Sequence, residues 1–204
     1  MLKIWGRANS INVQKVLWCC GELNLPFERI DAGMQFGVNN TPEYKAKNPN
    51  GLVPLIDDDG FVLWESQPIV RYLARKHSLG SLCPADAQAC ADADRWMDWN
   101  ATTVWPNLRP VFWNLVRTEP AKRDLPLIAT SRKGLAAGMI LLDAHLAARS
   151  YVAAATSRWA TFPSAYQFSA GSGWTSSAKT CRTSPHITSA CRHGPRTRNM
   201  PICR

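Results

Sequence analysis

Short runs in which apolar and polar residues alternate mark the first 78 residues of the chain. Such alternation is typical of half-buried strands, whereas apolar residues three and four positions apart are typical of helices. The pattern predicts four strands, at residues 2–6, 27–32, 55–56 and 61–64. It predicts three helices, at residues 12–25, 41–48 and 66–77. The order strand, helix, strand, helix, strand, strand, helix indicates a small α/β domain.

The connections between these elements predict how the strands pair. The first two strands are joined through a helix, and such a crossover makes them parallel. The last two strands flank an acidic turn that ends in Gly60, which predicts an antiparallel hairpin. Thr41 and Ser66 are expected to cap the helices that follow them, and Pro42 suits a first helical position.

From about residue 86 the pattern becomes helical and offers no good strand. One helix is expected at 89–108, kinked or ended near Pro106 and Pro110, and another at 131–150. The apolar stripe of the second consists of Leu135, Met139, Leu142 and Leu146. The expected domains are an α/β domain at 1–78, a linker at 79–85, a helical domain at 86–151 and an aberrant tail at 152–204.

The charge of the chain, +9 in total, is concentrated in this tail. Residues 1–151 contain 17 Lys and Arg against 15 Asp and Glu, whereas residues 152–204 contain 7 and none. A nucleic-acid partner would require a basic stripe with interleaved aromatic residues on the folded part, so we expect none. The tail also holds 15 Ser and Thr residues, and its composition differs from that of the rest of the chain.

The seven cysteines predict neither a disulfide framework nor a metal site, because their number is odd and no CxxC pair occurs. Cys19 and Cys20 lie inside an expected helix, and we interpret them as packing residues. The N-terminal residues lack the apolar segment of a signal peptide, and no apolar run approaches the length of a membrane span. We therefore expect a cytoplasmic protein with no metal and no membrane association.

Polar residues between the first strand and the first helix form a candidate anion site. Ser10 and Asn12 lie where backbone N–H groups at a helix N-terminus favour an anion. A hydroxyl there can donate to a thiolate and lower the pKa of the thiol. Taken alone, these two residues are better explained by simple helix capping.

Two further segments carry candidate binding groups. A cis bond between Val53 and Pro54 would turn the Val53 backbone toward an extended peptide, although an ordinary trans proline is the alternative. Glu65 and Ser66 lie at the turn into a helix, where the hydroxyl and backbone N–H groups could hold a carboxylate and Glu65 an amine. The alternative is a helix cap with an acidic neighbour.

A thiol-activating hydroxyl, a peptide-pairing edge and an amino-acid clamp together describe a site for glutathione. The strings "GRANSINVQKVLW", "NPNGLVPLIDDDGFVLWESQPIVRYLA" and "ADRWMDW" carry a resemblance to a known family. Through them, residues 1–150 resemble cytosolic glutathione transferases of the serine-using, theta-like bacterial kind. The resemblance implies a thioredoxin-like α/β N-terminal domain, an all-α C-terminal domain whose last helices are missing here, and a homodimer.

The resemblance also implies roles for individual residues. Ser10 would activate the thiol, with Asn12 as an assistant or substitute. Val53, before Pro54, would pair with the cysteinyl part of glutathione, and Glu65 with Ser66 would hold its γ-glutamyl part. A basic or polar residue usually meets the glycyl carboxylate. The candidates for that role, which the sequence does not rank, are Lys45, Lys47 and Asn40.

The expected function is transfer of glutathione, used as a substrate, to an electrophilic small molecule, with no metal involved. Alternatives on the same scaffold are glutathione-dependent dehalogenation, isomerisation or peroxide reduction. A non-catalytic glutathione-binding protein is an alternative of another class. A damaged gene product with little stable function is the third.

The tail beginning near Ala154 suggests translation in a shifted reading frame. The resemblance implies a Gly-Asp turn and a helix start resembling "GDxFTMADIP" after "YVA", where the chain has "AATSRWATFP". One legal set of codons for Ala154 to Pro163, read one base earlier, encodes "GDVAMGDIP". The alternative is a genuine basic tail. In either case the tail lacks the apolar periodicity of packed helices.

Overall fold

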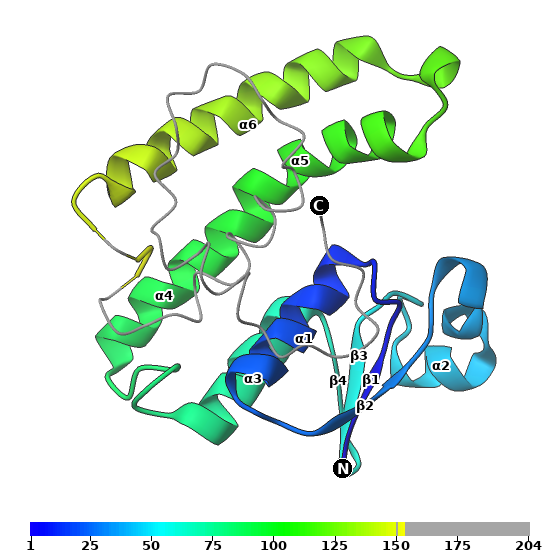
Figure 1. Cartoon of the computed structure of the whole chain (residues 1–204), viewed down its shortest axis with the longest axis vertical. Coiled ribbons are helices and arrows are strands. Elements are labelled where there is room, and N and C mark those ends of the chain that lie inside the picture. Colours follow the sequence, from blue (N-terminus) through cyan, green and yellow to red (C-terminus); the bar gives the residue numbers. More distant parts are fainter. Residues whose placement is uncertain (150, 154–204) are drawn as a thin grey trace. The chain divides into compact units, whose positions relative to one another are not determined.

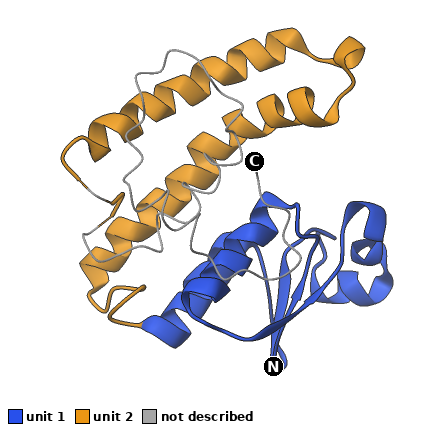
Figure 2. Ribbon diagram, in the orientation of Figure 1, with its two compact units in different colours: residues 1–78, 183–204 blue, residues 79–182 orange. Residues whose placement is uncertain are grey.

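The computed structural model describes residues 1–149 and 151–153 of the chain. These residues belong to two compact units, the first containing Met1–Ser78 and the second beginning at Leu79 (Figure 2). The aberrant tail expected at 152–204 lies outside the described residues, apart from its first two positions.

The first unit is built on a four-stranded sheet in the order β2-β1-β3-β4. The strands are β1 (Leu2–Trp5), β2 (Phe27–Ile30), β3 (Leu55–Asp58) and β4 (Phe61–Trp64). β1 pairs parallel with β2 and antiparallel with β3, and β3 pairs antiparallel with β4. The predicted crossover and hairpin are therefore confirmed.

Three helices surround this sheet, namely α1 (Ile11–Glu22), α2 (Pro42–Lys47) and α3 (Ser66–Ser78). Figure 1 shows α1 and α3 side by side on one face of the sheet and α2 on the other. Thr41 caps α2 as expected, since its side chain accepts a hydrogen bond from the Tyr44 N–H at 3.3 Å. Ser66 was expected to cap α3 and is instead its first helical residue, because the carbonyl of Glu65 already accepts the hydrogen bond of Ile69 N–H.

The core of the first unit lies between the sheet and the pair α1 and α3. Burying one such aliphatic side chain contributes about 1.5–3 kcal/mol, so this layer provides much of the stability of the unit. The side chains with no solvent exposure in this layer include Ile4, Ile56, Val13, Val16, Ile69 and Leu73. Leu55 is equally buried on the other face of the sheet, where it clusters with Ala32 and Tyr44. Cys19 and Cys20 are equally buried on α1, and burial raises the pKa of the Cys20 thiol to about 12, so both thiols have the environment of packing residues.

The second unit is helical in the part that the structure describes. α4 (Ala87–Trp99) continues through a π-helical turn (Asn100–Val104) into α5 (Trp105–Phe112) and a second π-helical turn (Trp113–Arg117). The sequence led us to expect that this helix is kinked or ends near Pro106 and Pro110. It does not end at either proline, because α5 continues past both to Phe112. Pro106 lies in the first turn of α5, and a π-helical turn lies on each side of α5. Such π-helical turns commonly accommodate missing or displaced backbone hydrogen bonds.

α6 (Leu125–Leu146) is longer than the pattern predicted, because it begins six residues earlier. Asp124 caps it by accepting the Leu127 N–H at 2.9 Å, and Pro126 occupies the first turn. Of the expected stripe, Leu135 and Leu142 are buried. Among the described helices, α6 alone is long and apolar enough to cross a membrane by length and composition, a property that core helices of soluble proteins share.

α5 and α6 pack against each other, and a glycine allows their close approach. A Cβ atom on Gly134 would lie 2.3 Å from the Asn107 Oδ1 atom, which is closer than real Cβ atoms come. A Cβ atom on Gly138 would lie 3.6 Å from the Trp99 ring, an ordinary contact. Gly134 is therefore the position where the absence of a side chain matters.

Candidate active site

A small cavity in the first unit, of about 40 Å³, brings most of the predicted site residues together. Its lining consists of Asn12, Asn48, Leu52, Val53, Pro54, Glu65 and Ser66. These residues come from the start of α1, from the loop before β3 and from the junction of β4 and α3. Segments distant in the sequence thus meet at one place, as the sequence predicted for Asn12, Val53, Pro54, Glu65 and Ser66.

Ser10 is placed differently from the other predicted residues. It is the buried N-cap of α1, and its carbonyl accepts the first helical hydrogen bond, from Gln14 N–H at 2.9 Å. Within the described part of the chain its hydroxyl makes no capping hydrogen bond, so capping by the side chain does not explain this serine. Among the described residues that line the cavity, Asn12 represents α1 and Ser10 is not included.

The loop before Val53 is held in place by hydrogen bonds to one carbonyl group. Tyr44 Oη donates to the Leu52 carbonyl oxygen at 2.7 Å, and Asn48 Nδ2 donates to the same oxygen at 2.9 Å. Asn48 is itself buried, and its Oδ1 accepts the Asn50 backbone N–H at 3.1 Å. The peptide bond between Val53 and Pro54 is cis, as expected. Asn48 and Leu52 were not predicted, although the Asn-Pro-Asn-Gly turn is a recognisable signal.

Glu65 occupies an unusual backbone conformation at the cavity. Its φ of 72° lies in the left-handed region, which residues with a side chain adopt at a cost of about 1–3 kcal/mol. Such residues are concentrated at binding and catalytic sites. The conformation ends β4 and begins α3 within one residue, which places Glu65 and Ser66 together in the lining.

Lys15 adds a buried charge beneath these groups. It is 3% exposed on α1, and its Nζ donates to the Asn12 Oδ1 atom at 3.0 Å. Burial lowers the pKa of Lys15 to about 8, and the negative charge of Glu65 acts in the opposite direction. Lys15 carries no signal in the sequence, because nothing in a helical pattern distinguishes a buried lysine from an exposed one.

The candidates for holding a terminal carboxylate remain apart from the cavity lining. Lys47 Nζ lies 3.9 Å from Asp57 Oδ2 and 4.8 Å from the centre of the Trp5 ring. Lys45 and Asn40 are exposed. Neither these three residues nor any other basic residue lines the small cavity as described, so the structure selects none of them. The described residues contain no group of three or more His, Cys, Asp or Glu that could hold a metal ion.

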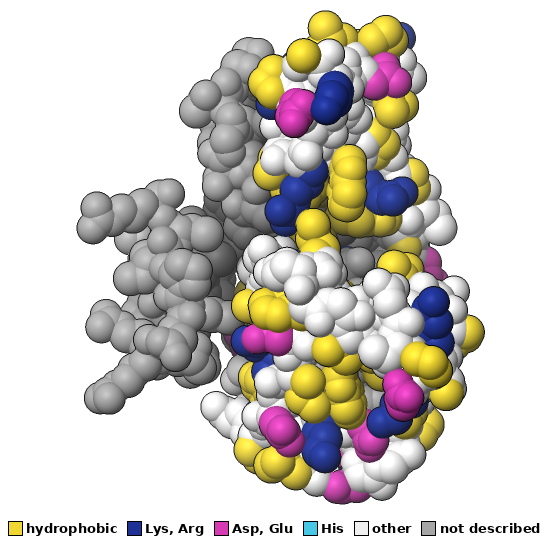
Figure 3. Space-filling view, turned by 90° about the vertical axis from the view of Figure 1, so that its right-hand side faces the viewer, with side chains coloured by type: hydrophobic (Ala, Val, Ile, Leu, Met, Phe, Trp, Pro, Cys, Tyr) yellow, Lys and Arg dark blue, Asp and Glu magenta, His cyan; other side chains and the backbone are white. Residues whose placement is uncertain are grey.

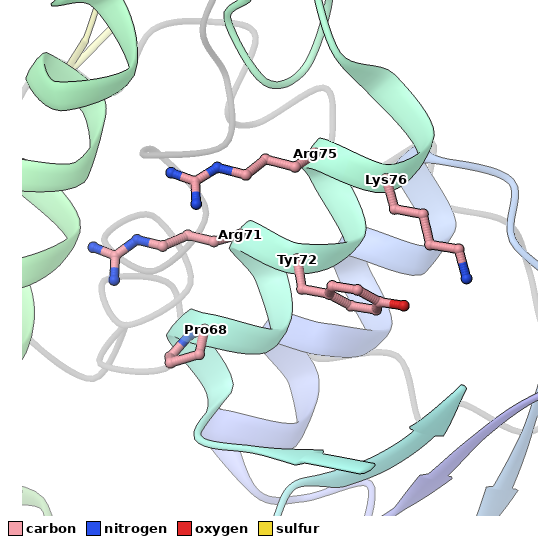
Figure 4. Close-up of a pocket in the computed structure, with 5 residues that line it drawn as sticks. All are labelled: Pro68, Arg71, Tyr72, Arg75 and Lys76. Atoms are coloured by element: carbon pink, nitrogen blue, oxygen red, sulfur yellow. The ribbon is translucent and has the colours of Figure 1, made fainter. Parts of the chain in front are cut away.

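A larger hollow, of about 510 Å³, lies on the outer side of α3. Its lining consists of Pro68, Arg71, Tyr72, Arg75 and Lys76. Figure 4 shows Arg71 and Arg75 extending on one side of α3 and Lys76 on the other. It contains none of the predicted site residues, so we regard the smaller cavity as the candidate active site.

Charged groups are mixed on the face of the molecule seen in Figure 3. Lys and Arg side chains lie among Asp and Glu side chains, with hydrophobic side chains between them. The described residues on that face do not gather into a basic stripe. This distribution agrees with the nearly balanced charge of residues 1–151.

The fold and the cavity define a class of protein, and comparison with known proteins identifies it. A thioredoxin-like sheet with flanking helices is followed by a helical region, and the cavity lies at the cis-proline loop. The family model "Glutathione S-transferase, N-terminal domain" matches residues 9–76. The chain is 46% identical over 149 residues to glutathione S-transferase GstB of Escherichia coli (strain K12), a match that covers 72% of each chain. The chain belongs to the glutathione S-transferase family.

Other relatives agree with this assignment. Glutathione S-transferase 3 of Zea mays is 35% identical over 156 residues, covering 74% of this chain and 70% of its own. The crystal structure of a theta class glutathione S-transferase from Xanthomonas axonopodis pv. citri, with glutathione bound, matches with a TM-score of 0.87 and 34% identity. It covers 99% of both chains. The resemblance inferred from the sequence and the expected transferase class are confirmed.

Proposed function

We propose that the chain binds glutathione at the small cavity and joins the glutathione sulfur to an electrophilic small molecule. The observation that carries the proposal is the convergence of Asn12, Val53, Glu65 and Ser66 on one cavity. These groups are suited to the γ-glutamyl part, the cysteinyl backbone and the thiol of an extended glutathione molecule. The Xanthomonas structure, which has glutathione bound, supports the same ligand for this chain.

The proposed binding assigns one task to each element. The backbone of Val53, at the cis bond before Pro54, pairs with the cysteinyl part of glutathione in the manner of an added strand. Ser66 and the N–H groups at the start of α3 hold the γ-glutamyl carboxylate, and Glu65 holds its amine. The thiol then lies near the N-terminus of α1, where Ser10 and Asn12 are located.

The proposed catalysis consists of thiol ionisation and substrate orientation. Donors at the start of α1 stabilise a thiolate, so that more of the bound glutathione is a nucleophile near neutral pH. The thiolate attacks the electrophilic atom of the second substrate, forms a carbon–sulfur bond and displaces a leaving group or adds across an activated double bond. Holding the two reactants together supplies much of the remaining acceleration.

Calorimetric titration of the full chain with glutathione, followed by a panel of electrophiles, tests this function. We expect saturable binding that Ser66→Ala weakens and turnover that Ser10→Ala or Asn12→Ala lowers. Binding without turnover of any electrophile would support a binding protein instead. No binding by a folded chain would contradict the proposal altogether.

Homodimer formation and cytoplasmic location are parts of the same proposal. The family resemblance supports a dimer, which sedimentation of the purified chain would detect. The four described cysteines, Cys19, Cys20, Cys83 and Cys90, are not in disulfide bonds, as is usual in a reducing compartment. Cell fractionation tests the location.

A shifted reading frame after Ala153 is also part of the proposal, and it concerns residues outside the described ones. Two observations support it. The tail has no acidic residue. The match to GstB covers 72% of each chain, which leaves a similar length of both unmatched. Sequencing the coding DNA decides the matter. If the alternative frame lacks a continuous helical continuation, the shift did not occur.

A further inference from the structure

Lys15 is an uncommon residue to find buried beneath a cavity. Lysine is almost never fully buried without a partner, because removing its charge from water is costly. In this structure it lies on α1, three residues after Asn12, on the same side of the helix. Its Nζ donates to the Asn12 Oδ1 atom at 3.0 Å.

This contact determines which end of the Asn12 amide is engaged. A lysine ammonium has three donors and no acceptor, so it can bind only the amide oxygen. The amide nitrogen, with two N–H donors, is then the remaining polar end of the side chain. Because Asn12 lines the cavity, its available groups toward a ligand are donors rather than an acceptor.

A donor is the group that a thiolate requires. A thiolate accepts hydrogen bonds, and each one from a fixed donor favours its charged form. The opposite amide orientation would present an oxygen and repel the thiolate. The positive charge of Lys15 also favours the thiolate, as the donors do. Glu65 carries the opposite charge and interacts with Lys15.

We propose that Lys15 is a positioning residue, which holds the Asn12 amide with its N–H groups toward the thiolate of bound glutathione. This proposal rests on the proposed function, since it names how one residue of that site is oriented. It also gives Asn12 the role of a direct donor beside Ser10.

Replacement of Lys15 by methionine, which keeps an unbranched apolar chain of similar length, tests the proposal. We expect Lys15→Met to lower kcat/KM about tenfold and to raise the pKa of the bound thiol, followed by thiolate absorbance, by about one unit. In the Asn12→Ala background the same change should have little further effect, because the group that Lys15 positions is gone. Lys133→Met, an exposed lysine on another helix, is the matched control.

A second variant keeps the experiment decisive if Lys15→Met folds poorly. Asn12→Asp retains an acceptor for Lys15 but removes the amide donors, and it should raise the thiol pKa as Asn12→Ala does. If Lys15→Met leaves both kcat/KM and the thiol pKa unchanged, or if its effect adds fully to that of Asn12→Ala, Lys15 has only a structural role. The proposal for Lys15 then fails, while the proposed function of the chain still stands. If the unaltered chain binds no glutathione, both proposals fail.

An independent observation concerns the segment between α3 and α4 in the second unit. The Sγ atoms of Cys83 and Cys90 lie 3.7 Å apart, and both thiols contact the Pro84 carbonyl oxygen, at 3.5 Å and 3.2 Å. Cys83 is buried and Cys90 is half-buried. The cap of α4, in which Asp86 accepts the Ala89 N–H at 2.8 Å, fixes the first turn that carries Cys90.

We infer that Cys83 and Cys90 form an oxidation site that closes to a disulfide in the presence of glutathione disulfide. The more exposed Cys90 attacks one sulfur of the oxidant as a thiolate, forms a mixed disulfide and releases one glutathione. The Cys83 sulfur then attacks the Cys90 sulfur and releases the second glutathione. Two protons and two electrons leave the cysteines and convert one glutathione disulfide to two glutathione molecules. Side-chain rotation brings the sulfurs from contact to bonding distance, about 2 Å.

Peptide mapping of the full chain after treatment with glutathione disulfide tests this site. We expect a peptide that links Cys83 to Cys90 and has lost two hydrogen atoms, and a melting temperature a few degrees higher. Cys83→Ser should instead retain one glutathione on Cys90, and Cys90→Ser should leave Cys83 reduced. Full alkylation of both residues after treatment, or a link that joins either to another cysteine, would overturn the inference.

Discussion

The two units of this chain differ in how completely their described residues cover the hydrophobic side chains. In the first unit, helices cover both faces of the sheet, and Ile4, Leu55 and Ile69 have no solvent exposure. In the second unit, α6 carries Ile140 with 71% exposure beside the buried Leu142. Both units nevertheless contain helices with side-chain caps, Thr41 at α2 in the first and Asp124 at α6 in the second. Local sequence signals therefore suffice to form helices, whereas closing a core needs partners from distant parts of the chain.

Matched isoleucine substitutions should give the largest difference between the units. Ile4→Ala removes a fully buried side chain and should lower the free energy of unfolding by about 2–5 kcal/mol. Ile140→Ala removes a largely exposed one and should change it by less than about 0.5 kcal/mol. Urea unfolding of both variants measures the difference. Equal losses would show that Ile140 is covered in solution.

The buried charge of the first unit should make stability depend on pH. The pKa of Lys15 is about 8 in the folded chain and near 10.5 when unfolded, so between these values the unfolded chain binds the additional proton. Stability from this group therefore rises with pH in that window, by about 1 kcal/mol per pH unit.

The comparison with Lys15→Met isolates this effect, because the raised pKa values of Cys20 and Tyr44 cancel in the difference. Urea unfolding at several pH values between 7 and 10 should show the unaltered chain gaining on the variant as pH rises. A constant difference between the two would mean that Lys15 is solvated.

Helix contact in the second unit should depend on one glycine and not on the other. Gly134→Ala displaces the Asn107 side chain, which also donates to the Thr103 carbonyl at 2.8 Å, and should cost about 1 kcal/mol or more. Gly138→Ala meets only an ordinary contact with Trp99 and should stabilise by up to about 1 kcal/mol. Thermal unfolding of the two variants gives the order, and the opposite order would show that α5 and α6 are not in the described contact.

Removal of helix caps should have the smallest effect and should not distinguish the units. Thr41→Ala in the first unit and Asp124→Ala in the second each remove one acceptor for a backbone N–H. Each should cost about 1 kcal/mol, because capping is local. Circular dichroism during thermal unfolding measures both. A much larger loss for Thr41 would mean that α2 depends on its cap for tertiary contacts as well.

The sequence predicted the elements of the first unit because their signals were local and mutually consistent. Alternation, a turn at Gly60 and the cap Thr41 needed no knowledge of distant residues. The helix through Pro106 and Pro110 was predicted less well, since π-helical turns that accommodate prolines leave no mark in the hydrophobic pattern.

The candidate site shows the same division between local signals and tertiary contacts. Val53, Pro54, Glu65 and Ser66 were found because the resemblance to a family supplied their long-range grouping. Asn48 and Lys15 form hydrogen bonds to residues four and three positions away, but their burial depends on tertiary packing, so neither stands out among similar residues in the sequence. The meeting of Cys83 with Cys90 is likewise a result of how the segment before α4 folds.

The left-handed backbone at Glu65 has a consequence for the evolution of this site. Glycine or asparagine would adopt a φ of 72° with less difficulty, yet neither offers a negative charge. Substitution of Glu65 by a residue that suits this backbone conformation would therefore remove the carboxylate. Keeping the glutamate retains the conformational penalty. A saturation library at this position should separate the two pressures: selection for folding alone enriches glycine, and selection for ligand binding enriches acidic residues.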